Sequence, residues 1–110
     1  MAVVSWENAK TVPRKGDPEG FMKIYVDESI GARRLRIHLS SLGAHRKPHE
    51  PHRHDWEEVF FILEGEAKLI VDGRELKAGS MTAVFIRPGS LHGIENAGDK
   101  PLRYLVITAK

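Results

Sequence analysis

From residue 21 onwards the chain alternates short extended segments with turn residues, and this alternation constrains its fold more than any other feature. The turn signals recur about every eight to twelve residues, as they do in all-β domains. No stretch has a convincing helical period. The sequence therefore predicts an all-β sandwich or barrel, with strands expected at 21–26, 32–39, 59–63, 67–71, 81–86 and 102–108.

The chain has 110 residues, which is enough for one hydrophobic core and too few for two. Residues 21–110 are expected to form a single β-barrel domain. Residues 1–20 contain Pro13, Gly16 and Pro18 and are expected to form an N-terminal arm or an edge strand.

Composition excludes several classes of function. The chain has no cysteine, so disulfides, thiolate metal sites and cysteine nucleophiles are excluded. A formal net charge of +2 argues against a strong generic affinity for nucleic acid or an anionic membrane. No apolar run approaches the length of a membrane span, and a cytoplasmic location is the expectation.

The segment around 58–63 is apolar on both faces of its predicted strand. If Glu58 points inward, Phe60 and Ile62 share its face, and residues 59, 61 and 63 form an equally apolar outer face. A strand with one solvated face would alternate apolar and polar residues. Either the N-terminal arm or a second protomer should cover the outer face, and the pattern alone leaves both open.

The residues with the most informative chemistry are His52, His54, Glu58 and His92. Three imidazoles and one carboxylate suit a divalent transition metal that keeps some coordination positions open. Two histidines one residue apart point the same way on an extended backbone. Four residues of straight strand would carry Glu58 roughly 13 Å from His54, so a shared ion requires a bend through 55–57. Only the tertiary fold can bring His92 to the same place.

Two spaced motifs resemble those of the cupin superfamily. The first motif has two histidines one apart, then a glutamate and a glycine, and the second has proline, glycine, histidine and asparagine. The matching residues here are His52, His54, Glu58 and Gly65, followed by Gly89, His92 and Asn96. Pro88 lies one place after the expected proline position, which Arg87 occupies. Arg46 occupies the place of the glycine that usually opens the first motif. Gly79 would open the second motif, but it lies two residues too far from the proline position.

The resemblance implies a double-stranded β-helix, or jelly-roll barrel, and a homodimer. It also implies that His52, His54, Glu58 and His92 hold one divalent transition metal per chain, which could be Fe, Mn, Ni, Co or Zn. The spacing selects Glu58 over Glu57 as the ligand. The departures from the motifs affect loops near the mouth and leave all four ligand positions intact.

The remaining candidates have weaker signals. His49 could lie at the pocket rim as an acid–base or supporting residue, whereas His45 reads as part of a flexible basic loop. Arg34, Arg36 and His38 alternate with apolar residues. We favour a solvated strand face for these three, the alternative being a pocket wall that binds a substrate carboxylate or phosphate.

Two hypotheses of function follow. The first is a small-molecule enzyme, in which iron would support dioxygenase chemistry and the other ions isomerase, lyase or hydrolytic chemistry. The second is a non-catalytic ligand-binding or sensor protein, without room for a DNA-binding helix-turn-helix. A purely structural barrel is disfavoured, because four complete ligand positions have no structural need to be ionisable.

Overall fold

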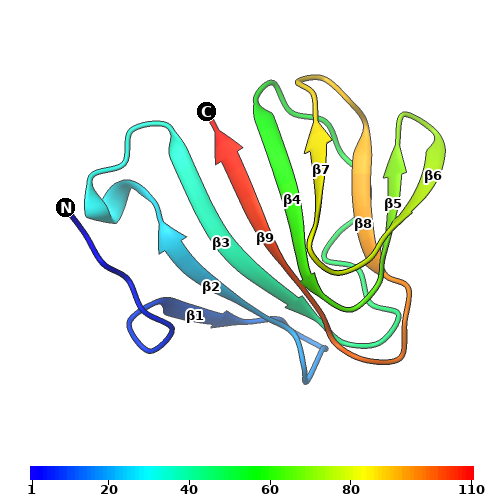
Figure 1. The fold of residues 1–110 in the computed structure, drawn as a ribbon, viewed down its shortest axis with the longest axis horizontal. Coiled ribbons are helices and arrows are strands. Elements are labelled where there is room, and N and C mark those ends of the chain that lie inside the picture. The colour runs from blue at the N-terminus through cyan, green and yellow to red at the C-terminus, as the bar shows by residue number, and fades with distance from the viewer.

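The computed structural model describes residues 1–110 and confirms the all-β prediction. Its nine strands form two antiparallel sheets that face each other as a jelly-roll barrel (Figure 1). The larger sheet has the order β1-β2-β3-β9-β4-β7 and the smaller one the order β6-β5-β8. The strands are β1 (Lys10–Pro13), β2 (Phe21–Val26), β3 (Leu35–Leu42), β4 (Glu57–Glu64), β5 (Ala67–Val71), β6 (Arg74–Ala78), β7 (Thr82–Ile86), β8 (His92–Asn96) and β9 (Leu102–Ala109).

Two strands are missing from the sequence-based expectation: β6 and β8. Strand β1 lies within residues 1–20, for which an arm or an edge strand was expected. Strand β6 has the sequence RELKA and lies at the edge of the smaller sheet, where polar side chains face solvent. Strand β8 has the sequence HGIEN, whose polar residues are nevertheless largely buried. Neither sequence has the apolar content by which strands are normally recognised. The six predicted strands all exist, with ends shifted by up to three residues.

Turn chemistry sets the register of the smaller sheet. Strands β5 and β6 pair from Ala67↔Ala78 to Val71↔Arg74, so only Asp72 and Gly73 connect them. Both have positive φ, 50° and 81°, which is the conformation that a type I′ hairpin requires. Aspartate and glycine are among the few residues that tolerate it. The predicted hairpin of β2 and β3 is also present, with a short 3₁₀ turn at Glu28–Ile30 between the strands.

The hydrophobic core fills one end of the barrel. Its members come from both sheets and include the inner face of β4, where Phe60 packs edge-to-face on Tyr104 with ring centroids 5.6 Å apart. The fully enclosed aliphatic members are Leu42, Ile62, Leu69, Ile86 and Leu102. Toward the other end, the inner faces of the same strands carry polar side chains such as Glu58 and Thr108, and there a cavity replaces the core.

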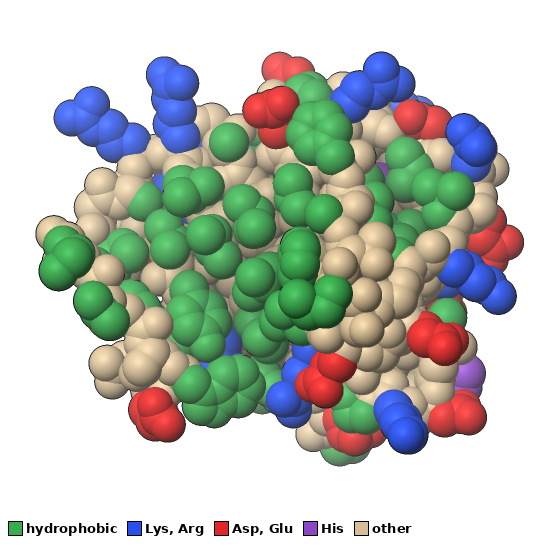
Figure 2. Space-filling view, viewed as in Figure 1, with side chains coloured by type: hydrophobic (Ala, Val, Ile, Leu, Met, Phe, Trp, Pro, Cys, Tyr) green, Lys and Arg blue, Asp and Glu red, His purple; other side chains and the backbone are tan.

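The outer face of the larger sheet is apolar and only partly covered. Residues 1–9 lie over β2, where Trp6 contacts Phe21 and its carbonyl oxygen accepts a hydrogen bond from Lys23 Nζ at 2.8 Å. The half formed by β4, β7 and β9 has no such cover, and Phe85 is 54% exposed. Figure 2 shows hydrophobic side chains gathered over the region of the larger sheet. No helix in the structure has the length and apolar character needed to cross a membrane.

Leu69 and Leu76 test the position of the core, because they are cross-strand partners that differ in burial. Leu69 is fully buried and Leu76 is 40% exposed. We expect Leu69→Ala to lower the free energy of unfolding by roughly 2–4 kcal/mol, through lost burial and a residual cavity. Leu76→Ala should cost less than half as much. Urea denaturation measures both, and equal losses would contradict the packing described.

Candidate metal centre

Backbone pairing brings His52 and His92 together. The two residues form an isolated antiparallel bridge with reciprocal N–H to O=C hydrogen bonds, both 2.9 Å long. This bridge attaches the loop before β4 to the first residue of β8. His54 follows two residues after His52, so the ligand nitrogens of all three histidines lie within 4.8 Å of one another. These three side chains could hold a metal ion.

Glu58 reaches the same cluster through a bend. The backbone bends at Asp55 and Trp56 before β4 begins, as the sequence requires for a shared site. Glu58 Oε1 then lies 3.3 Å from His54 Nε2 and 3.2 Å from His92 Nε2, and the residue is 6% exposed. Burial acts to raise the pKa of the Glu58 carboxyl, but the attraction of His92 and His54 outweighs it and holds the pKa below its usual value. The carboxylate is therefore ionised.

The His92 ring is oriented by its own turn. Its Nδ1 lies 2.8 Å from the carbonyl oxygen of Ser90, which fixes Nδ1 as the donor and leaves the lone pair on Nε2. Asp72 holds this turn in place, because its carboxylate accepts hydrogen bonds from Ser90 Oγ at 2.7 Å and from the Leu91 amide at 2.9 Å. A carbonyl partner of this kind is the usual way in which a metal-binding imidazole is aimed.

Two buried nitrogens of the cluster make no hydrogen bond, and this is the observation that fits a metal. His92 Nε2 and His54 Nδ1 are both fully buried without a hydrogen-bond partner. Buried polar atoms in proteins are nearly always paired. For His92, burial acts to lower the pKa, but Glu58 and the Ser90 carbonyl outweigh it and raise it. The contact between Glu58 and His92 thus favours a positive charge between the two side chains, which a metal cation would supply.

Neighbouring aromatic rings fix the other two histidines. Trp56 stacks on His54 with a centroid distance of 4.4 Å and an interplanar angle of 4°. His49 lies 4.2 Å from His52, centroid to centroid, at the exposed side of the cavity. Burial lowers the pKa of His52 and the nearby histidines lower it further, so its imidazole stays neutral, as metal ligation requires.

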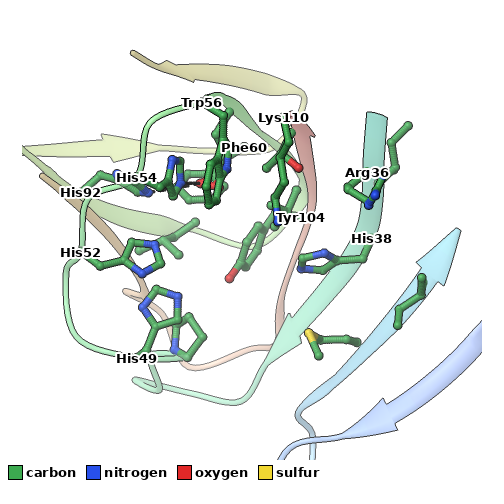
Figure 3. Close-up of a pocket in the computed structure, with 18 of the residues that line it drawn as sticks. Arg36, His38, His49, His52, His54, Trp56, Phe60, His92, Tyr104 and Lys110 are labelled. Atoms are coloured by element: carbon green, nitrogen blue, oxygen red, sulfur yellow. Dashed lines mark hydrogen bonds and ion pairs between the residues drawn. The ribbon is translucent and has the colours of Figure 1, made fainter. Parts of the chain in front are cut away.

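The cavity above the cluster has a volume of about 560 Å³. In Figure 3 the four histidines His49, His52, His54 and His92 lie on one side, and His38 faces them from strand β3. The indole N–H of Trp56 and the hydroxyl of Thr108, both on residues that line the cavity, are buried without hydrogen-bond partners. Unpaired polar groups on an internal wall are suited to a polar ligand.

The interpretation of β3 as a strand with a solvated face is wrong for Arg36 and His38, which line the cavity. A strand with one polar face has the same sequence pattern whether that face meets bulk water or an internal cavity. The sequence could therefore not distinguish the two environments. Arg34 precedes the strand and is exposed. His45 is also exposed and pairs with Asp99 at 3.0 Å. Asn96 bonds three backbone carbonyls, as a turn residue would.

Sequence reasoning missed Arg14 and Tyr104 as cavity residues. Arg14 lies in the segment interpreted as an arm or edge strand, and Tyr104 lies in the predicted strand 102–108. The only available signal for Tyr104 was its hydroxyl, since a buried tyrosine normally finds a polar partner.

The chain belongs to the cupin family, whose cupin domain model matches residues 40–108. Among curated proteins, the uncharacterized protein MJ1618 of Methanocaldococcus jannaschii is 35% identical over 49 residues. That match covers 44% of this chain and 39% of MJ1618, so it spans about two fifths of the relative's length.

Solved structures share the whole fold. The polyketide cyclase RemF from Streptomyces resistomycificus is 27% identical, with a TM-score of 0.82 over 99% of this chain and 79% of that chain. A predicted oxalate decarboxylase from Thermotoga maritima is 19% identical, with a TM-score of 0.83 over 98% of each chain. The second likeness shows the fold alone.

The ionisation of Tyr104 tests how completely its side chain is shielded from water. Burial raises the pKa of its hydroxyl to about 12, with a smaller opposing effect from Ser40. An unfolded tyrosine ionises near pH 10, so between about pH 10 and 12 only the unfolded chain loses this proton and stability falls as pH rises. Tyr104→Phe should abolish this part of the pH dependence. Near-ultraviolet titration of both proteins gives the Tyr104 midpoint by difference, and a midpoint near pH 10 would contradict the burial.

Proposed function

We propose that this protein is a metal-dependent cupin enzyme acting on a small polar molecule, with His52, His54, Glu58 and His92 holding one divalent transition metal. The observation that carries the proposal is the convergence of these side chains at the wall of a cavity, with His92 Nε2 buried and without a hydrogen bond. Three imidazoles and one carboxylate suit iron, manganese, nickel, cobalt or zinc.

When bound, such an ion would supply a Lewis-acidic centre for isomerase or lyase chemistry or, if it is iron, a centre for dioxygenase chemistry. The chain's own residues hold and orient the ligand set. Glu58 neutralises part of the ion's charge, Ser90 aims His92, and the flat contact with Trp56 limits rotation of His54. Likeness to a polyketide cyclase favours the isomerase or lyase type over the dioxygenase type.

His38 is the best placed group for accepting a proton from the ligand. It lies on β3, across the cavity from the histidine cluster (Figure 3). Burial lowers its pKa, and the nearby Arg14 guanidinium lowers it further, so the imidazole is neutral near pH 7. A neutral imidazole can act as a general base. His49, at the exposed side of the cavity, is the weaker candidate.

Metal analysis tests the ligand assignment. Elemental analysis of the purified protein should find about one transition-metal ion per chain, and His92→Ala should lose most of it. His45→Ala is the matched control, because His45 is exposed and contacts Asp99 away from the cluster. Full metal retention by His92→Ala would refute the site. Metal without turnover on a panel of hydroxy acids, keto acids and diketones would favour the non-catalytic ligand-binding alternative.

We also propose that the protein is a homodimer through the outer face of β4, β7 and β9. This outer face carries Val59, Phe61, Phe85, Leu105 and Ile107, which the register places side by side. Residues 1–9 cover β2 instead, so the arm does not shield these side chains. A contiguous apolar face of this kind usually marks an interface. A second copy is the occupant we favour, because a flat apolar sheet with few charges can pack on itself.

Light scattering at micromolar concentration should give about twice the 12.4 kDa of one chain. Phe85→Arg should shift the protein to a monomer, because it places a charge at the most exposed side chain of the apolar face. Leu76→Arg is the control, since Leu76 is similarly exposed but lies on the other sheet. A wild-type mass near that of one chain would rule out the dimer.

A further inference from the structure

Arg14 enters the cavity from outside the family's matched region. It follows β1 directly, and the family match begins only at residue 40. Its amide donates to the Gly20 carbonyl at 3.0 Å. Asp17, three residues later, accepts hydrogen bonds from the amides of Gly43 at 3.0 Å and Glu19 at 3.2 Å. These contacts fasten the turn between β1 and β2 to the end of β3, so the position of Arg14 is built into the fold.

The Arg14 guanidinium is partly buried and has no anionic partner. Its Nη2 donates to Ser40 Oγ at 2.6 Å, whereas Nε is fully buried and makes no hydrogen bond. No carboxylate of the chain lies within ion-pair distance of it. Arg36, on the same side of the cavity, differs because it pairs with Glu28 at 3.3 Å. A sheltered guanidinium without a counter-charge is costly unless a ligand supplies one.

Of the polar groups near Arg14, Tyr104 is a donor and His38 is uncharged. The Asp17 carboxylate, which lines the neighbouring hollow, accepts hydrogen bonds from the amides of Gly43 and Glu19. Tyr104 is 1% exposed and lines the same cavity, and Figure 3 shows its hydroxyl directed into the open space. Its raised pKa keeps the hydroxyl protonated at neutral pH, so it can donate to an anion. His38 is neutral, as described above. Asp27, which also lines the cavity, accepts a hydrogen bond from the Ser29 amide at 2.9 Å.

A basic depression continues from Arg14 toward the surface. Arg14 lines this second hollow as well as the cavity, together with Lys15, Arg46 and Lys47. Clustered positive charge at an entrance raises the local concentration of anions and speeds their binding. The cavity therefore has a cationic approach at the end that Arg14 occupies.

We propose that Arg14 and the Tyr104 hydroxyl form an anion-binding subsite, across the cavity from the histidine cluster, so that the ligand of this protein carries a carboxylate or phosphate group. The planar guanidinium offers several N–H donors in one fork, a geometry that suits both oxyanions. The inference rests on the proposed function only in assuming that the ligand occupies this cavity. It names the substrate class: an anionic metabolite whose other end reaches the histidines.

Calorimetric titration of the metal-loaded protein with inorganic phosphate and, separately, with acetate tests the subsite. We expect saturable binding of one of the two anions, and the stronger one identifies the class. Arg14→Met should weaken that binding at least about tenfold, and Arg14→Lys should retain part of it because it keeps the charge. Arg34→Met should bind as the wild type does, since Arg34 is exposed and does not line the cavity.

Two outcomes would overturn the proposal: no saturable binding of either anion, or the same affinity in Arg14→Met as in the wild type. Circular dichroism checks that each variant is folded. If Arg14→Met does not fold, Arg14→Lys still tests the subsite. Metal content, measured on the same samples, should not change with Arg14. If the purified wild-type protein contains no metal but still binds an anion through Arg14, the metal centre is refuted and the anion subsite is supported.

Discussion

The pairing of His52 with His92 is the contact on which the rest of the site depends. Two backbone hydrogen bonds join residues 40 positions apart and attach a loop to the smaller sheet. They hold the loop that carries His52 and His54 against β8, together with the bond from the Gly89 amide to the His54 carbonyl at 2.8 Å. With them, three imidazoles converge, and the bend at Asp55 and Trp56 brings Glu58 in from the larger sheet. The cluster therefore also ties the two sheets of the barrel together at the open end.

The same end of the barrel has little apolar packing to hold it. The core occupies the opposite end, where both sheets contribute enclosed aliphatic side chains. Around the cavity, order comes from directed hydrogen bonds instead: Asp72 to the turn before His92, and Asp17 to the start of the loop after β3. Such bonds fix orientation more strictly than apolar contacts do, which suits a site whose ligand atoms must converge on one point. Stability and function are thus assigned to different ends of one small barrel.

Sequence reasoning captured what depends on local patterns. Strand periodicity and turn dipeptides predicted the all-β fold, and motif spacing identified the four candidate ligands. It failed where the environment of a polar face decides its role. Strand β8 was missed because its buried face carries His92 and Asn96 in place of apolar residues. Arg36 and His38 were read as solvated, because an internal cavity leaves the same alternation as bulk water. Arg14 has no sequence signal, since only the turn anchored by Asp17 carries it to the cavity.

The candidate metal ligands and several residues of the facing cavity wall come from different parts of the chain. The residues that would hold a metal lie within the matched segment 40–108, whereas Arg14, Arg36 and His38 lie before it. Metal binding would then be encoded within the matched segment, whereas the proposed anion subsite would combine Arg14 from before it with Tyr104 from within it. If a metal cation were bound at one wall and partly balanced by Glu58, the uncompensated guanidinium at the other wall would leave the cavity with net positive charge. Binding a neutral molecule would leave the Arg14 charge without a partner in a sheltered site, whereas an anion removes that cost. Electrostatics therefore selects the ligand class even before any contact specific to its shape is made.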